Sequence, residues 1–186
     1  MKNDNLKKIN IMKKLCSLIA ALAVLFFSSE LAHAQGDFSS KTIHIGVIAS
    51  DLDESLDFYK EVVGMKQTGE FSVDETMAKE SGLSNGVPFD VKVLKLGNGE
   101  EATQFKLMSF GDRADKQHND YIYDHSGMQY ITINVKDLSP VIERVKANNV
   151  TMQGSSPVKL GENRYLLLIR DPDGTFVELI GPWTDK

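Results

Sequence analysis

The stretch His44–Met65, HIGVIASDLDESLDFYKEVVGM, decides the fold. Its first residues alternate in the two-residue period of a β-strand. Asp51 and Glu54 then stand three residues apart, as an N-cap and its partner do in a capping box. An apolar stripe follows at helical spacing, made of Leu52, Leu56, Tyr59 and Val63. Gly64 is typical of a residue that ends a helix. The sequence therefore predicts a strand followed by a capped helix, with His44 at the start of the strand.

The segment Tyr130–Val150, YITINVKDLSPVIERVKANNV, is a weaker copy of this unit and begins 86 positions later. Tyr130 falls where His44 stood. Ser139 followed by Pro140 predicts the N-cap and the first residue of a second helix. The chain is therefore predicted to contain a duplicated module, in which a strand and a helix are followed by further strands.

The remaining elements are predicted from alternating apolar residues and from turn-forming residues. In the turn Asp171–Gly174, DPDG, proline presets φ and glycine accepts a positive φ. The other expected elements are strands at 65–72, 90–96, 103–110, 164–170 and 176–180, a strand with a turn at 153–161, and a short helix over a loop at 73–83.

These residues resemble the vicinal oxygen chelate superfamily, which contains the glyoxalases and the bleomycin-resistance proteins. The resemblance is carried by the strand–helix opening, by the turn Asp171–Gly174 and by the strand FVEL at 176–179, and it extends over about residues 41–183. It implies an α+β fold of two tandem βαβββ modules, whose curved sheets form a barrel around a pocket. In the metal-dependent relatives, four inward side chains hold a divalent cation, one from the first and one from the last strand of each module.

Residues 1–34 are expected to be a signal peptide. Basic residues precede an apolar run of 13, Leu15–Phe27, and a small-x-small motif ends at Ala34. A bilayer-spanning helix needs roughly 20 residues, so this run is too short. Cleavage after Ala34 predicts a periplasmic or secreted protein with no stable membrane anchor; an uncleaved anchor is the alternative. Translation can begin at Met1 or at Met12, because a complete signal peptide follows either start.

The mature chain is expected to form one domain with an acidic balance. Of the 21 basic and 26 acidic residues, the signal peptide holds five and two, so 16 and 24 remain. This balance argues against a nucleic acid or an anionic membrane surface as a partner. The expected parts are a flexible N-terminus at 35–40 and a family domain at 41–183, with module one at 41–110, a connection at 111–126 and module two at 127–182.

Four positions carry the expected chemistry. By register with the family motif they are His44, Lys106, Tyr130 and Glu178. The resemblance implies metal ligands at all four, but this chain keeps a ligand only at His44 and Glu178. An ammonium has no lone pair for a metal, and it repels a dication. We therefore expect no metal site of the family type and no cofactor, and a ligand-binding site made of these four residues.

A rearranged metal site is the alternative. Gln104 lies on the same strand face as Lys106, and a β-bulge would present its amide while turning Lys106 outward. A divalent metal would then be held by His44, Gln104 and Glu178 together with water. His125 is a further ligand that can reach the site from the connection.

Lys106 is expected to stand near Glu178, because a lysine among apolar walls needs a carboxylate partner. His44 and Tyr130 would complete a polar cluster on the pocket floor. In one hypothesis the ion pair is chemically inert. In the other, Lys106 or Tyr130 polarises a carbonyl or oxyanion of the ligand and Glu178 acts as a base, so these three are the candidate catalytic residues.

Three functions from different classes remain. The favoured one is an exported, metal-free protein that binds a small molecule. The runner-up is a metal-dependent enzyme of the glyoxalase type, a lyase, isomerase, epimerase or dioxygenase, since the resemblance implies reactions that chelate an oxyanion through the metal. The third is an accessory domain with no small ligand. The sequence is compatible with modules that pair within one chain and with modules that pair across a homodimer.

Overall fold

The computed structural model describes residues 38–114, 116 and 118–184. The expected signal peptide lies outside the described residues. Thr42–Lys186 forms one compact unit, to which all of the described helices and strands belong. Within the described part of the chain, no helix combines the length and the hydropathy that crossing a membrane requires.

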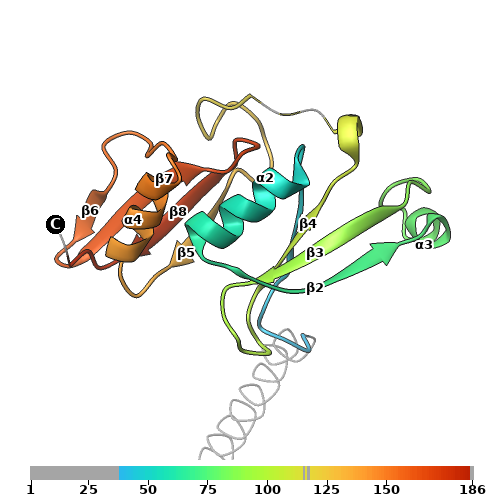
Figure 1. Cartoon of the computed structure of the whole chain (residues 1–186), viewed down its shortest axis with the longest axis horizontal. Helices are drawn as coiled ribbons and strands as arrows, with labels where there is room; N and C mark the ends of the chain where they lie inside the picture. The colour runs from blue at the N-terminus through green and yellow to red at the C-terminus, as the bar shows by residue number, and fades with distance from the viewer. Residues whose placement is uncertain (1–37, 115, 117, 185–186) are drawn as a thin grey trace, which may run out of the picture. The chain divides into compact units, whose positions relative to one another are not determined.

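The first module forms a four-stranded sheet in the order β1-β4-β3-β2 (Figure 1). The strands β1 and β4 are parallel, and the other neighbours are antiparallel. The elements in chain order are β1 (Ile45–Ile48), α2 (Leu52–Asp57), η1 (Phe58–Val63), β2 (Lys66–Val73), α3 (Glu75–Glu80), β3 (Phe89–Lys95) and β4 (Gln104–Met108).

The second module repeats this arrangement, with the strand order β5-β8-β7-β6 and a parallel pair β5–β8. The connection carries a short 3-10 helix, η2 (Gly111–Arg113). The elements are β5 (Tyr130–Asn134), α4 (Ser139–Ala147), β6 (Val158–Gly161), β7 (Arg164–Arg170) and β8 (Phe176–Gly181). The repeated order confirms the predicted α+β fold of two tandem βαβββ modules.

The first helix begins as predicted but changes its geometry half-way. The Asp51 carboxylate accepts a hydrogen bond from the Glu54 amide at 3.0 Å, as an N-cap does. From Phe58 onward the helix widens into the π-helix η1, in which the Gly64 amide donates to the Tyr59 carbonyl. Gly64 ends the helix at a φ of 91°, a left-handed conformation that glycine adopts without strain.

The start of α4 differs from the prediction. Ser139 is the first helical residue, and Leu138 occupies the N-cap position without a side-chain hydrogen bond. The Asp137 carboxylate accepts from both the amide and the hydroxyl of Ser139, each at 3.0 Å. The prediction of Ser139 as the N-cap is therefore wrong by one residue, because an aspartate two positions earlier satisfies a free amide of the first turn.

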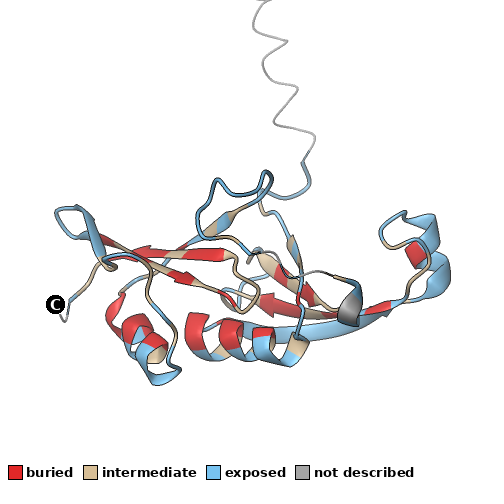
Figure 2. Ribbon diagram, turned by 90° about the horizontal axis from the view of Figure 1, so that it is seen from above, coloured by how far each residue is buried: buried red, intermediate tan, exposed pale blue. Residues whose placement is uncertain are grey.

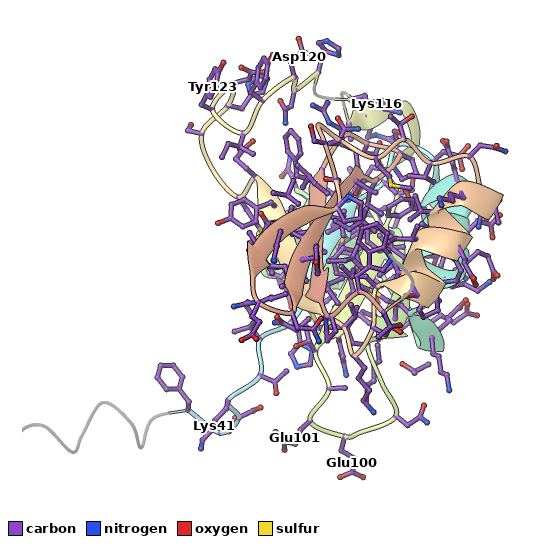
Figure 3. The ribbon with its side chains drawn as sticks, turned by 90° about the vertical axis from the view of Figure 1, so that its left-hand side faces the viewer. Lys41, Glu100, Glu101, Lys116, Asp120 and Tyr123 are labelled. Atoms are coloured by element: carbon purple, nitrogen blue, oxygen red, sulfur yellow. The ribbon has the colours of Figure 1, made fainter. Side chains whose placement is uncertain are left out.

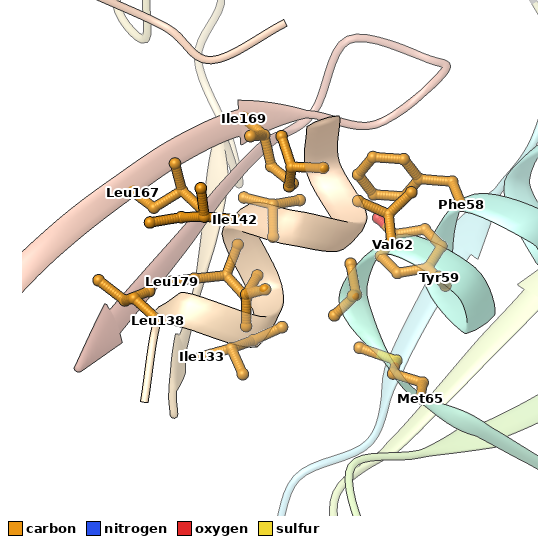
Figure 4. Close-up of a cluster of buried hydrophobic side chains, with 14 of the residues drawn as sticks. Phe58, Tyr59, Val62, Met65, Ile133, Leu138, Ile142, Leu167, Ile169 and Leu179 are labelled. Carbon is orange, nitrogen blue, oxygen red and sulfur yellow. The ribbon is translucent and has the colours of Figure 1, made fainter. Parts of the chain in front are cut away.

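One hydrophobic core joins the two modules. It lies between the helices and the sheet faces that they cover, and it contains side chains from η1, α4 and both sheets. Figure 4 shows Phe58 and Tyr59 of η1 facing Ile142 and Ile169 of the second module. Buried residues concentrate in the strands and helices, while the connecting loops are largely exposed (Figure 2).

Hydrogen bonds reinforce the seam between the modules. The Tyr59 hydroxyl donates to the buried carboxylate of Asp171 at 2.8 Å. The Arg144 guanidinium of α4 donates to the carbonyl oxygens of Val62, at 3.0 Å, and Val63, at 3.2 Å. These two carbonyls lie at the end of η1, where helical carbonyls lack partners within the helix.

The second face of each sheet is not covered by α2, η1 or α4. We call these the first open face, which carries Lys106 on the sheet of β1–β4, and the second open face, which carries Glu178 on the sheet of β5–β8. The described strands form two separate sheets, so the expected barrel around a pocket is not closed within one chain. The reason is physical: the modules join through their helix-covered sides, where the largest buried apolar residues gather.

Candidate functional site

Three rows of side chains cross the first open face. Ile45 and Val47 of β1 pack against the core. Alternation therefore places Gly46 and Ile48 on the first open face. His44 was predicted at the start of the strand but precedes β1 by one residue, and extending the same alternation places it on this face. Register partners in neighbouring strands share a face. The rows are Ile48–Met108–Val91–Phe71, then Gly46–Lys106–Val93–Gly69, then His44 followed by Gln104–Lys95–Lys66.

Lys106 stands in the middle row between Gly46 and Val93, and Gly69 follows Val93 at the end of the row. Its ammonium lies 6.0 Å from the centroid of the Phe71 ring. A Cβ at Gly69 would meet nothing within 4 Å, and one at Gly46 would touch only Met108, at 3.4 Å. The two ends of this row therefore carry no side chain, and the Met108 methyl group borders the space at Gly46.

The second open face carries Tyr130 and Glu178. Tyr130 is about half exposed, at 48%. Glu178 is in register with Thr132, and its carboxylate accepts a hydrogen bond from the Thr132 hydroxyl at 2.6 Å. Arg170 lies at one end of this face, with its guanidinium carbon 4.4 Å from the Phe176 ring centroid.

The structure places the four predicted positions on two different sheet faces, two on each, and not in one cluster. His44 and Lys106 lie on the first open face, while Tyr130 and Glu178 lie on the second. The expected contact between Lys106 and Glu178 is not made within one chain, because the helices and not the open faces meet at the seam. Among the described residues, Lys92 forms an ion pair with Glu70, and the His118 imidazole lies 3.4 Å from the Asp120 carboxylate.

The donor set does not fit the divalent metal that the family resemblance implies. The Lys106 ammonium has no lone pair for a metal. The four positions also lie on two different sheet faces, so they do not surround one point. Among the described residues, no group of three or more His, Cys, Asp or Glu side chains converges. Gln104 shares the first open face with His44, whereas Glu178 lies on the second. The alternative set of His44, Gln104 and Glu178 is therefore not assembled by one chain.

A cleft of about 430 Å³ lies at the helix side of the seam. One wall comes from α2 and η1, and the other from the segment after α4 and the end of β7. None of the four predicted positions lines it. No motif indicated this cleft, because its walls are far apart in the sequence. The lining includes Glu54, Asp57, Phe58, Asn149, Val150 and Asp171.

Asp171 and Tyr59 form a buried polar pair that sequence reasoning missed. The Asp171 carboxylate accepts from the Tyr59 hydroxyl and, at 2.7 Å, from the Thr175 amide. Burial raises the pKa of Asp171. Burial and the adjacent Asp171 carboxylate raise the pKa of Tyr59. Local patterns predicted Tyr59 as part of an apolar helix stripe and Asp171 as a turn residue, and neither pattern indicates a contact between modules.

Comparisons with known proteins find relatives over most of the chain. A family model described as the Glyoxalase/Bleomycin resistance protein/Dioxygenase superfamily matches residues 41–179. A lactoylglutathione lyase of Haemophilus influenzae is 29% identical over 140 residues, which cover 74% of this chain and 90% of that protein. A lactoylglutathione lyase of Arabidopsis thaliana is 30% identical over 141 residues, which cover 74% of this chain but 43% of that protein. The chain thus spans less than half of the plant relative.

Solved structures share the fold. A glyoxalase family protein from Bacillus cereus superimposes with a TM-score of 0.66 at 16% identity, covering 82% of this chain and 100% of that one. A trypanothione-dependent glyoxalase I of Leishmania major superimposes with a TM-score of 0.55 at 21% identity, covering 77% and 87%. At such identities the likeness concerns the arrangement of the two modules and not the chemistry.

Proposed function

Because this chain belongs to the Glyoxalase/Bleomycin resistance protein/Dioxygenase superfamily, we propose that it is an exported member that binds a small molecule without the divalent metal of its relatives. The proposal depends above all on one observation. Lys106 occupies the position on β4 where the family resemblance implies a metal ligand, and it stands on an open sheet face. Its ammonium supplies a positive charge at that position without any coordination bond.

The ligand would use the polar groups of the open faces directly. Lys106 and His44 offer hydrogen-bond donors on the first open face, and Tyr130 and Glu178 offer a phenol and a carboxylate on the second. Apolar side chains stand in the row next to Lys106, among them Ile48, Met108 and Phe71, and small-molecule sites usually combine such a lining with a few polar groups. In this proposal Lys106 holds or polarises an oxygen of the ligand, a role that a cation has in metal-dependent relatives.

We propose that a homodimer completes the site by placing the first open face of one copy against the second open face of the other. Exposed apolar side chains lie on both faces, among them Ile48 (49% exposed), Phe71 (46%) and Tyr130. Exposed apolar patches mark interaction sites. Lys106 on one face and Glu178 on the other also carry opposite charges, which favours such pairing.

Export is proposed from the expected signal peptide at 1–34. Its basic start, short apolar run and small-x-small motif at Ala34 support cleavage there. Mass spectrometry of the protein from a cell-envelope fraction should give a mature N-terminus at Gln35. An intact N-terminus in that fraction would count against cleavage.

The competing function is a metal-dependent lyase of the glyoxalase type. It is supported by the activity named for the Haemophilus relative and by Gln104, whose amide shares the first open face with His44. In a dimer, Glu178 of the second copy would complete the alternative set. This reading requires Lys106 to turn away from the metal.

Metal content separates the two functions. The purified protein is incubated with Zn²⁺ and Ni²⁺, passed through a desalting column and assayed by mass spectrometry of the metals. We expect well under one equivalent of retained metal per chain. The matched control is His118→Ala, because His118 is an exposed histidine of the connection. One equivalent that is lost in His44→Ala and kept in His118→Ala would establish the metal-dependent alternative.

A further inference from the structure

The strand residues that lie on the open faces are mainly basic, although the whole chain is acidic. The formal net charge of the chain is −5. Three acidic residues lie in the described strands, and register with buried core residues places Glu70 and Asp90 on the helix-covered side. Of these three acidic residues in the described strands, only Glu178 therefore lies on an open face. The basic residues that register and alternation place on them are Lys66, Lys95 and Lys106 on the first, and Arg164 and Arg170 on the second.

The positive charge of the first open face is concentrated at one end. Lys95 and Lys66 are in register next to Gln104, in the row that continues from His44. The hairpin turn after Lys95 carries Glu100 and Glu101, and Figure 3 shows these at its tip, beyond the sheet. Lys106 lies one row inward. An anionic group above this end of the sheet would meet several positive charges at once.

The opposite end of the first open face is apolar. Ile48, Met108, Val91 and Phe71 stand in one row, and Val91 is buried. Val91 is buried in a second apolar cluster together with Ala78 of α3, and Met108 packs against this cluster. The Phe71 ring reaches toward the Lys106 ammonium. The face therefore changes from charged to apolar along the strands, with Lys106 at the boundary and open space above Gly69.

We infer that the first open face selects an organic anion with an apolar body. The carboxylate or other acid group lies between Lys106 and Lys95, and the apolar body lies over Ile48, Met108 and Phe71. This inference rests on the proposed function, since it names the ligand class of the same site. A charge-assisted hydrogen bond and the burial of apolar surface supply the affinity. Glu178 of a second copy would offset only part of the positive charge of the site.

Two probes of equal shape test the charge requirement. The ligands 1-naphthaleneacetate and 1-naphthaleneacetamide differ in charge but hardly in size, and calorimetry measures the binding of each to the full-length protein. We expect the acetate to bind about tenfold more tightly than the amide, because a hydrogen bond to a charged group contributes at least that factor. Raising the salt concentration should weaken binding of the acetate and leave the amide unaffected.

Three variants locate the binding. Lys106→Met removes the charge and keeps the stem, so it should abolish the preference for the acetate. Lys159→Met is the matched control, because Lys159 is an exposed strand lysine that register with the buried Tyr165 places away from the open faces. Phe71→Ala should weaken both probes and preserve the preference. Thermal unfolding confirms that each variant is folded.

Equal affinity for the two probes, or an acetate preference that survives Lys106→Met, would overturn the inference, as would the absence of binding by both probes. The result is independent of the metal assay. A metal-free protein that prefers the amide contradicts the ligand class alone, whereas a metal-loaded protein that prefers the acetate contradicts the proposed function alone.

Discussion

Tyr59 and Asp171 show how single residues hold the two modules in one arrangement. The Tyr59 hydroxyl donates across the seam to the carboxylate of Asp171, a residue that is 5% exposed. Tyr59→Phe would leave this carboxylate without one of its donors. We expect a loss of about 1–3 kcal/mol in the free energy of unfolding, the usual cost of an unsatisfied buried acceptor. Urea unfolding followed by tryptophan fluorescence measures it. Tyr130→Phe, at an exposed position, should change stability by less than about 0.5 kcal/mol; equal effects of the two variants would contradict a role for the buried pair.

Asp171 also predicts a pH dependence of stability. In an unfolded chain the pKa of an aspartate is about 3.9. Because burial raises the pKa of Asp171, the folded protein keeps this proton over a pH range in which the unfolded chain has released it. The contribution of Asp171 to the free energy of unfolding is therefore greatest at low pH and is lost as pH rises from about 4 through the raised pKa.

Comparing unfolding of the wild type and Asp171→Asn across this pH range isolates the effect. The asparagine does not titrate, so the stability of the wild type relative to the variant should fall as pH rises from about 4 toward neutrality. A relative stability that increases over the same range would mean that the pKa of Asp171 is lowered in the folded protein.

The site residues were only partly predictable from sequence at this scale. Strand alternation correctly predicted that Gln104 and Lys106 share a face. Alternation predicts the sheet face of a residue but not the element that packs on this face. The expected contact between Lys106 and Glu178 was therefore not supported by any local pattern. The pair of Tyr59 and Asp171 escaped prediction for the same reason.

At the scale of elements, the contact between α4 and η1 depends on Arg144. Its guanidinium satisfies two carbonyls at the end of η1, where the helix dipole also favours a positive charge. Arg144→Met should lower the free energy of unfolding by about 1–2 kcal/mol. Lys146→Met on the exposed side of the same helix is the control and should have little effect. The arginine contact would be dispensable if the two variants unfolded at the same denaturant concentration.

Local signals predicted the helices and strands well where they were strong. The cap at Asp51, the left-handed Gly64 and the turn ending at Gly174 all have backbone requirements that few residues meet. The π-helical half of the first helix was not predicted, because its apolar spacing also fits an α-helix. Ser139 was misplaced by one residue because Asp137 competes for the same amides.

At the scale of the molecule, duplication was visible in the sequence, but the pairing of the two modules was not. Both modules hide an apolar helix side and leave an open sheet face, so sequence alone is compatible with several pairings. The proposed homodimer allows the pairing of the two open faces to be tested by mutation. Lys106→Glu or Glu178→Lys alone should weaken dimerisation about tenfold, since each puts like charges on facing surfaces.

The double exchange, Lys106→Glu with Glu178→Lys, should restore dimerisation, because the opposite charges are then only swapped. Analytical ultracentrifugation over a concentration series measures each dissociation constant. If the wild type sediments as a monomer throughout, or the double variant is as weak as either single one, the two open faces do not meet in this way.

We propose that a lysine ammonium replaces metal coordination at position 106. The most direct test of this claim is X-ray diffraction at the zinc edge from crystals grown with excess Zn²⁺. We predict no anomalous peak at coordination distance, about 2.0–2.2 Å, from the His44 imidazole or the Glu178 carboxylate on the open faces. A peak bound by His44 and Glu178 with Gln104 as a third ligand, and Lys106 turned away, would contradict the claim.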